Sequence, residues 1–407
     1  MSYKSDLYIF LPATNKNGHD IKSTACDVTG NADHFLRELS QTAKYEFDDL
    51  LGEKIKRHHI TDVVLICKSD DRECPEVLGE EKAFVTLSQC SATDFSLLII
   101  TVPNVSVSLT HLLDQASRGE LVVKDNDDEV LFSKWIKQYK IEIIGKAFFS
   151  ACLSEFPENE ANYIISGEAY NATTDFRINS KEITEHLSIN HAQYTHYDAY
   201  MSDFGIMYIV KNFSEDYTAR LNVECILIFI MELVILKITA INTVNNDVTV
   251  AFSKSEPSMD EILKISEKFA LSMPLWDIDR FRYLIAQKFA NKVSDSFKVS
   301  RYVEEYEKNQ RFLEHIISIR NLISSERETK IIGVVATMLA VFEILPTLYT
   351  IALYIIEGNS ISLSQILSAS STSIFIVLIM YLVFGKKKAL QKRIKNSSGE
   401  RFPKSDF

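Results

Sequence analysis

The chain has 407 residues, and 55 Asp and Glu against 44 Lys and Arg give it a net charge of −11. This acidic balance, with no sustained basic stripe interleaved with aromatic residues, excludes nucleic acid as the main ligand. The six cysteines are scattered without a CxxC pair or a zinc-finger histidine spacing, so they indicate reduced thiols and not a disulfide framework.

Residues 1–170 predict a cytosolic α/β domain. Asp6 and Pro12 interrupt the first apolar run, so the chain does not open like a signal peptide and we expect this part in the cytosol. Short runs rich in Val and Ile predict strands at residues 7–11, 61–67, 96–102, 120–123 and 141–144. Residues 32–58 predict a helix between the first two strands, and residues 162–170 either add a strand or close the sheet.

An acidic cluster inside this domain is the one candidate metal site. Asp125, Asp127 and Asp128 resemble the first half of a calcium loop, but Val130 stands where the loop needs glycine and no acidic residue closes it. A solvated turn and a weak site for a divalent cation, Mg²⁺ or another, are both open interpretations. No other cofactor is indicated.

Residues 171–213 form a polar and aromatic connecting or ligand-facing segment. Its histidines His186, His191 and His196 are spaced five apart, which places successive side chains about 140° apart around a helix. Exposed loop histidines therefore explain the spacing better than a helical metal site.

Residues 214–330 predict a helical stalk region. The apolar run of residues 221–244 is long enough to suggest a third membrane span, but Glu232 and Lys237 interrupt it, which favours a buried core helix. Residues 257–271 predict a second helix that begins at Pro257. From Asp277 the helical pattern meets no proline or glycine until Gly333, so we expect one continuous helix with an apolar stripe, which must pack as a coiled coil on other helices or on copies of itself.

Residues 331–385 predict a transmembrane hairpin. The spans 331–356 and 361–384 each exceed the roughly 20 apolar residues that cross a bilayer. Basic residues precede the first span and fill the tail, residues 386–407, whereas the loop between the spans has none. The positive-inside rule then predicts a two-pass protein of the cell membrane with both termini cytoplasmic. The expected fold class is an α+β membrane protein: an α/β head, a long stalk helix and a two-helix hairpin.

This order of elements resembles the CorA/ZntB-like two-transmembrane metal ion transporter superfamily. Pro346 in the first span and the basic tail also match that family. The chain lacks the family's Gly-Met-Asn signature, and Glu357, Gly358 and Asn359 occupy the corresponding outer loop. The resemblance implies a homo-oligomer, with the pentamer of that family as the expected assembly, whose first span lines the pore, and with the lipid bilayer and cations as further partners.

Glu343 is the most informative residue of the first span, since a carboxylate there is costly unless it faces water or a partner. Steps of three or four residues from it define a small and polar face that we expect to line a pore. Its members are Ile332, Ala336, Leu339, Ala340, Glu343, Thr347 and Thr350. The alternative is a protonated Glu343 that is hydrogen-bonded to the serine-rich second span.

Two functions follow from these patterns. The first is an oligomeric, CorA-like membrane cation channel or transporter with a regulatory head. The second is a membrane-anchored sensor or effector, for example in bacterial defence, whose hairpin permeabilises the membrane. Enzymatic activity is not expected, because the chain lacks the GxxxxGK[ST], GxSxG, HExxH and GxGxxG motifs and has only 12 glycines.

Overall fold

The computed structural model describes residues 3–15, 30–47, 55–69, 75–90, 95–125, 128–170, 180–254, 258–272 and 280–356. The chain divides into two compact units, residues 1–313 and 314–407. The described part of the second unit is helical and belongs to α10 (Val299–Ile356). All strands that the structure describes lie in the first unit, which we call the head.

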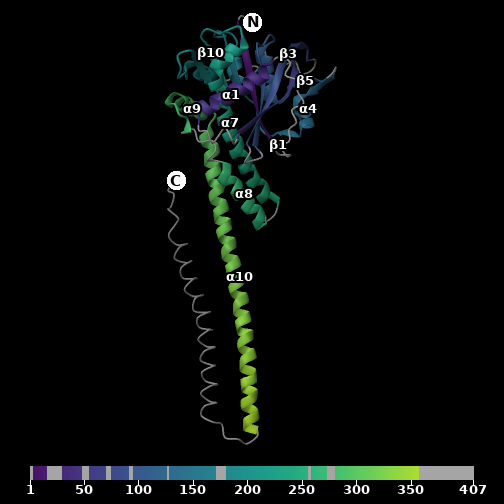
Figure 1. The fold of residues 1–407 in the computed structure, drawn as a ribbon, viewed down its shortest axis with the longest axis vertical. Coiled ribbons are helices and arrows are strands. Elements are labelled where there is room, and N and C mark those ends of the chain that lie inside the picture. Colours follow the sequence, from purple (N-terminus) through teal and green to yellow (C-terminus); the bar gives the residue numbers. More distant parts are fainter. Residues whose placement is uncertain are drawn as a thin grey trace. The chain divides into compact units, whose positions relative to one another are not determined.

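The head is built on one ten-stranded mixed sheet (Figure 1). Its strand order is β6-β5-β2-β3-β4-β1-β8-β10-β9, and β7 pairs with β1 beyond β8. Every pairing is antiparallel except that of β8 with β10. The strands are β1 (Ser5–Asn15), β2 (Ile55–Lys68), β3 (Val77–Cys90), β4 (Phe95–Val102), β5 (Val122–Asp125), β6 (Asp128–Leu131), β7 (Ile141–Ile143), β8 (Phe148–Leu153), β9 (Tyr197–Met201) and β10 (Gly205–Val210).

Helices cover both faces of the sheet. The central strand β1 is therefore buried on both sides. Leu7, Ile9 and Leu11 join the hydrophobic core that includes α3 (Leu109–Arg118) and α5 (Ala161–Ser166). Tyr8 lies on the opposite face, where it stacks on Phe35 of α1 (Asn31–Glu46), with ring centroids 6.2 Å apart. The remaining helices of the first half are α4 (Phe132–Trp135), the 3₁₀ helix η1 (Ile136–Tyr139) and α6 (Ser180–Ser188).

The α1 face of the sheet is also covered by α7 (Tyr217–Lys254). Leu227, Ile228, Phe229 and Ile230 of this helix are fully buried, which confirms the prediction of a core helix at residues 221–244. Two further helices pack on α7: α8 (Met259–Ser272) and α9 (Leu284–Ser296).

The helix expected to run unbroken from Asp277 is confirmed for Val299–Ile356, which form α10, but is wrong for the residues before it. The chain forms α9 and α10, with a break at Phe297 and Lys298. Lys298 has a φ of 53° and donates its backbone N–H to the Asp295 carbonyl at 3.1 Å. A residue in the left-handed conformation cannot continue an α-helix, so Lys298 separates α9 from α10. No proline or glycine marks this break in the sequence.

Two other expectations about the head are wrong. Residues 162–170 are not a strand, because α5 occupies Ala161–Ser166 and ends at Gly167, whose φ is 69°. The helix expected to run to residue 58 ends at Glu46, and β2 begins at Ile55. The strands β3, β6, β8, β9 and β10 had no counterpart in the expectations.

The expected membrane protein is contradicted. Within the ranges that the structure describes, no helix is long and apolar enough to cross a membrane. This finding overturns the α+β membrane fold class, the transmembrane hairpin and the two-pass location in the cell membrane with both termini cytoplasmic. Residues 331–356 are the end of α10, and the expected second span at 361–384 lies outside the described residues. A helix that is apolar all round has the same composition in lipid and in a protein interior. Its amino-acid sequence alone therefore does not distinguish a membrane-spanning helix from a buried one.

Candidate functional site

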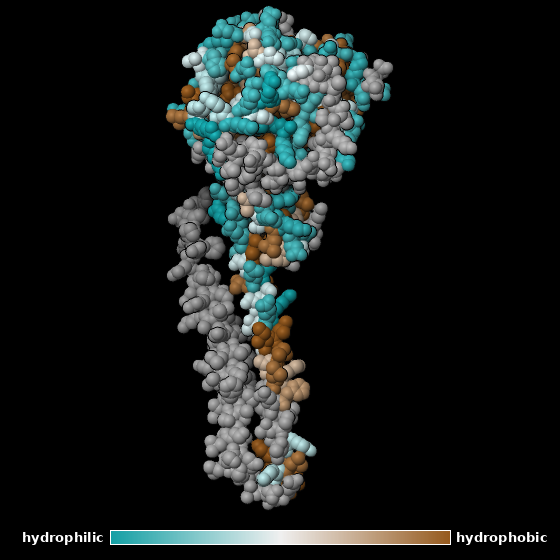
Figure 2. Space-filling view, viewed as in Figure 1, coloured by the Kyte–Doolittle hydropathy of each residue, from teal (hydrophilic) through white to brown (hydrophobic). Residues whose placement is uncertain are grey.

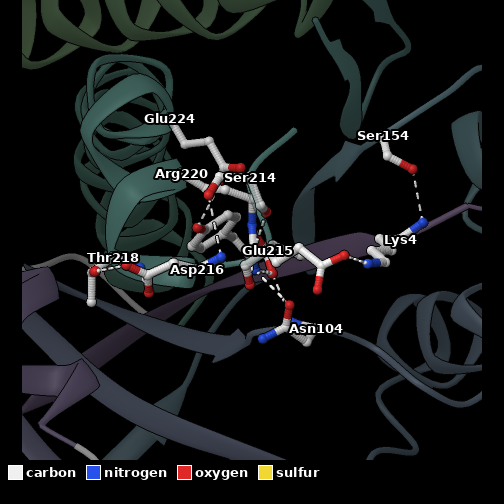
Figure 3. A network of polar contacts seen from close by, with 11 residues as sticks. Lys4, Asn104, Ser154, Ser214, Glu215, Asp216, Thr218, Arg220 and Glu224 are labelled. Atoms are coloured by element: carbon white, nitrogen blue, oxygen red, sulfur yellow. Dashed lines mark hydrogen bonds and ion pairs between the residues drawn. The ribbon is translucent and has the colours of Figure 1, made fainter. Parts of the chain in front are cut away.

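A buried polar network ties the start of α7 to β1 (Figure 3). Arg220 forms a two-pronged ion pair with Asp6, from Nε to Oδ2 at 2.6 Å and from Nη2 to Oδ1 at 2.7 Å. Both side chains are almost fully buried. Parallel contacts of this kind are the strongest form of a carboxylate–guanidinium pair.

Arg220 has no donor left for a ligand. Its Nη1 donates to the carbonyls of Ser214 and Glu215, at 2.8 and 2.9 Å, and its Nη2 also donates to Asn104 Oδ1 at 2.8 Å. Together with the two bonds to Asp6, these contacts use all five N–H groups of a guanidinium. Arg220 is therefore a structural clamp that joins three segments: β1, the turn after β4 and the chain before α7.

Asn104 and Asp216 complete the clamp at the ends of these segments. Asn104 has a φ of 53° and donates its backbone N–H to Asp6 Oδ1 at 2.7 Å. Asp216 caps α7 by accepting the N–H and hydroxyl of Thr218, at 3.1 and 2.7 Å. These hydrogen bonds lower the pKa of Asp216, as expected for an ionised cap at a helix N-terminus.

A second clamp holds α7 further along. Arg57 of β2 donates to Glu232 Oε1 and Oε2 at 2.9 and 2.7 Å, and the Ser88 hydroxyl of β3 also donates to Glu232. The guanidinium lies 5.8 Å from the centre of the Phe229 ring. Arg220 and Glu232 are separated by about 18 Å along the helix at 1.5 Å per residue, so α7 is fastened to the sheet at two points.

Glu224 lies between the two clamps and is fully buried. Its Oε2 accepts the Tyr8 hydroxyl at 2.7 Å. Burial, and then the negative charge of Asp6, raise the pKa of Glu224 from 4.5 to about 8. The Tyr8 hydroxyl and the Arg220 charge act in the opposite direction but are outweighed, because burial penalises the charged carboxylate.

Other buried oxygen atoms surround this pair. Thr101 of β4 and Ser150 of β8 stand directly opposite Tyr8 in the sheet. Their hydroxyls, Tyr217 OH and Glu224 Oε1 are buried without a hydrogen-bond partner of ordinary geometry in the described part of the chain. Weaker contacts link Ser150 and Glu224 to the Cys152 thiol, and Tyr217 to the Tyr8 hydroxyl. Such groups are rare in folded proteins, and their concentration around one carboxyl marks the most unusual polar site of the head.

The expected metal site is not brought together by the described residues. Asp125 and Asp128 face each other across the β5–β6 hairpin, whereas Asp127 lies outside the described residues. Among the residues that the structure covers, no group of three or more His, Cys, Asp or Glu side chains could hold a metal ion.

The expected pore face falls on α10 but is described only in part. Ile332 and Leu339 are 62% and 60% exposed, and Ala336 is half-buried. The side chains of Ala340, Glu343, Thr347 and Thr350 lie outside the described residues, as do Glu357, Gly358 and Asn359.

Sequence reasoning missed the whole network. In the sequence, Asp6 was used only as an argument against a signal peptide, and Glu232 was noted only as an interruption of an apolar run. The available signal was the charged residues Arg220, Glu224 and Glu232 within an otherwise apolar helix, since a buried charge needs a partner. Comparison of the chain with protein-family models, with curated proteins and with solved structures gives no match.

Proposed function

We propose that this chain is a self-assembling regulatory scaffold whose α10 helices from several copies form a bundle. The observation that carries the proposal is the run of exposed apolar side chains near the end of α10 (Figure 2). Phe342, for example, is 71% exposed. Contiguous apolar surface of this extent marks an interaction site in most proteins.

Most of the exposed apolar side chains fall on two stripes with a seven-residue spacing, and Ile332, Leu339 and Leu353 lie beside them. One stripe consists of Val334, Met338, Val341, Leu348 and Ile355, and an adjoining stripe consists of Ile331, Val335, Phe342, Tyr349 and Ile356. Apolar residues spaced in this way form the seams of coiled coils. Two adjoining stripes let each helix contact neighbours on two sides, which favours three or more copies over a simple pair.

The size of this surface is sufficient for a stable interface. Residues 331–356 extend about 40 Å at 1.5 Å per residue, and a cylinder roughly 10 Å wide then has on the order of 1,200 Å² over its whole circumference, which the neighbours in a bundle would share. A standard protein interface uses about 800 Å² per partner. Glu343 is the only charged residue in the sequence of residues 331–356, so this run as a whole favours an apolar partner, such as another copy of itself, over a charged one.

Within the head, α7 contacts the first part of α10. Asn309 Nδ2 donates to Asn245 Oδ1 at 2.9 Å, and the rings of Phe252 and Phe312 meet edge to face with centroids 4.9 Å apart. The same α7 is fastened to the sheet by the two clamps. This continuity supports a regulatory role for the head, because a change in how α7 packs would reach the helix that assembles.

Cation conduction and membrane permeabilisation form no part of this proposal, because both depended on the contradicted transmembrane hairpin. An enzymatic role is not proposed either, since both arginines of the network are committed to carboxylates. The clamps hold α7 in place, and a catalytic group would need an unsatisfied donor or acceptor within reach of a substrate.

Sedimentation velocity of the full chain at low micromolar concentration tests the scaffold. We expect an oligomer of at least three copies for the wild type and a monomer for the double variant Val341→Glu, Leu348→Glu, which places two charges in one stripe. The matched control is Ser324→Glu, which adds a charge at an exposed position in the polar part of α10 and should leave the oligomer intact.

A wild type that is monomeric under these conditions would overturn the proposal. If that monomer instead co-sediments with phosphatidylcholine vesicles, the apolar surface belongs to lipid and not to another copy. An oligomer that survives in the double variant would show that the copies associate through a different surface.

A further inference from the structure

The carboxyl of Glu224 is held at the point where α7 meets the central strands, between the two ion-pair clamps. Its position is rigid because Tyr8 donates to one carboxyl oxygen at 2.7 Å and both side chains are fully buried. Its second oxygen, Oε1, has no hydrogen-bond partner of ordinary geometry among the described residues. A fully buried carboxyl with one strong hydrogen bond, helped only by a weak contact from the Cys152 thiol, is a poor site for a negative charge.

The groups that face Glu224 from neighbouring elements do not neutralise it. β1 contributes Asp6 and Tyr8, β8 contributes the Cys152 thiol, and α7 contributes Arg220 and Tyr217. Further away, Cys152 raises the pKa of Tyr208 of β10, and Glu38 of α1 raises the pKa of Cys225 of α7. The one cation in this set is Arg220, whose five N–H groups are already committed to other acceptors.

A neutral Glu224 suits these surroundings better than an ionised one. The protonated carboxyl has an O–H to donate, and the strand register places the Thr101 and Ser150 hydroxyls on both sides of Tyr8. Each hydroxyl oxygen is an acceptor, and neither has a partner of ordinary geometry in the described residues. An ionised Glu224 would lose the donor and add a second negative charge next to Asp6.

We propose that Glu224 is a proton-operated latch: the neutral carboxyl holds α7 against the sheet, and loss of its proton loosens that contact. The two flanking clamps keep α7 attached when the latch opens, so the expected change is a local opening around Tyr8 and not unfolding of the head. The raised pKa of Glu224 agrees with this arrangement. The latch does not require the proposed self-association, because all of its residues lie in the head.

Two buried cysteines provide matched probes. Cys152 stands opposite Asp6 in the sheet, on the face that α7 covers, and contributes to the electrostatic environment of Glu224. Cys67 is buried in the hydrophobic core on the other face of the same sheet. Opening of α7 exposes the first thiol and not the second, whereas global unfolding exposes both.

The experiment measures alkylation by N-ethylmaleimide at each cysteine of the full chain, resolved by mass spectrometry, between pH 6 and pH 9. The quantity of interest is the labelling rate of Cys152 divided by that of Cys67, which removes the ordinary increase of thiol reactivity with pH. We expect this ratio to rise by up to about tenfold per pH unit below pH 8 in the wild type and then to level off, since one proton is released.

Two variants sharpen the test. Glu224→Gln cannot ionise and should make the ratio independent of pH, whereas Asp247→Asn changes a partly exposed carboxylate of the same helix and should behave like the wild type. A ratio that stays constant in the wild type would overturn the latch, as would a Glu224→Gln variant with the pH dependence of the wild type. The wild-type titration alone decides the question if Glu224→Gln does not fold.

Discussion

α7 and α10 are both long helices with long apolar runs, but they differ in how their side chains are used. In α7 the run is covered by the sheet, α1, α8 and α9, and its charged residues are paired across to the strands. In α10 the run beginning at Ile331 is exposed within the chain. The difference shows that an apolar run predicts burial against some partner. The charged residues within the run help to determine which partner that is, because they pair with residues of the opposite charge.

Arg220→Met should give the largest effect, because it leaves Asp6 as a buried, unpaired charge. Breaking one partner of a buried ion pair typically costs about 3–5 kcal/mol, so we expect the free energy of unfolding to fall by this amount in urea titrations of the full chain. The double variant Asp6→Asn, Arg220→Met removes both charges and should recover part of the loss. Equal losses in the single and double variants would mean that the clamp acts through packing and not through charge.

Two leucine truncations test the difference between the helices directly. Leu227 of α7 is fully buried, whereas Leu339 of α10 is 60% exposed and lies outside both apolar stripes. Leu227→Ala should therefore lower the free energy of unfolding by roughly 2–5 kcal/mol, and Leu339→Ala should change it by less than about 0.5 kcal/mol. A large decrease in the free energy of unfolding for Leu339→Ala would show that Leu339 is buried against a partner on that side of α10.

The local elements of the head were partly predictable from sequence. The Val- and Ile-rich runs at residues 7–11, 61–67 and 96–102 lie in β1, β2 and β4, because β-branched and aromatic residues suit a buried strand. β3 was missed because Gly79, Glu80, Glu81 and Lys82 conceal an extended strand that pairs along most of β2. Its formation depends on its partner, which a single stretch of sequence does not reveal.

The candidate site was not predictable for a related reason. Arg220 meets Asp6 across 214 positions of the chain, and Glu232 meets Arg57 across 175. Helical periodicity shows that Arg220 and Glu224 share a face of α7 but does not show which strand lies under that face. The strand order of the sheet supplies this information, and it is a property of the whole domain.

The pH dependence of stability provides a test of the Glu224 environment. The pKa of Glu224 is about 8 in the folded chain, against an ordinary value of 4.5. Because the folded state holds the proton more tightly, its contribution to stability is fully present below pH 4.5 and is lost as the pH rises towards 8. We expect a decrease of about 1.4 kcal/mol per pH unit in this window, measured by urea unfolding.

Glu224→Gln should remove this component, so that the difference in unfolding free energy between the variant and the wild type grows with pH. Residual pH dependence from other groups appears in both proteins and cancels in the difference. A difference that stays constant from pH 5 to pH 8 would show that Glu224 is ionised throughout, and that its surroundings stabilise the charge after all.

The smallest effect is expected at the β5–β6 hairpin, where Asp125 and Asp128 face each other as a cross-strand pair with exposed side chains. Like charges in this position destabilise a sheet by about 0.2–1 kcal/mol. Asp128→Asn should therefore raise the free energy of unfolding by a few tenths of a kcal/mol, and millimolar Mg²⁺ should not shift the unfolding midpoint of either protein. If the hairpin instead binds a divalent cation, Mg²⁺ stabilises the wild type and Asp128→Asn loses that gain. The direction in which Asp128→Asn changes the free energy of unfolding in the presence of Mg²⁺ thus separates a repulsive carboxylate pair from a metal site.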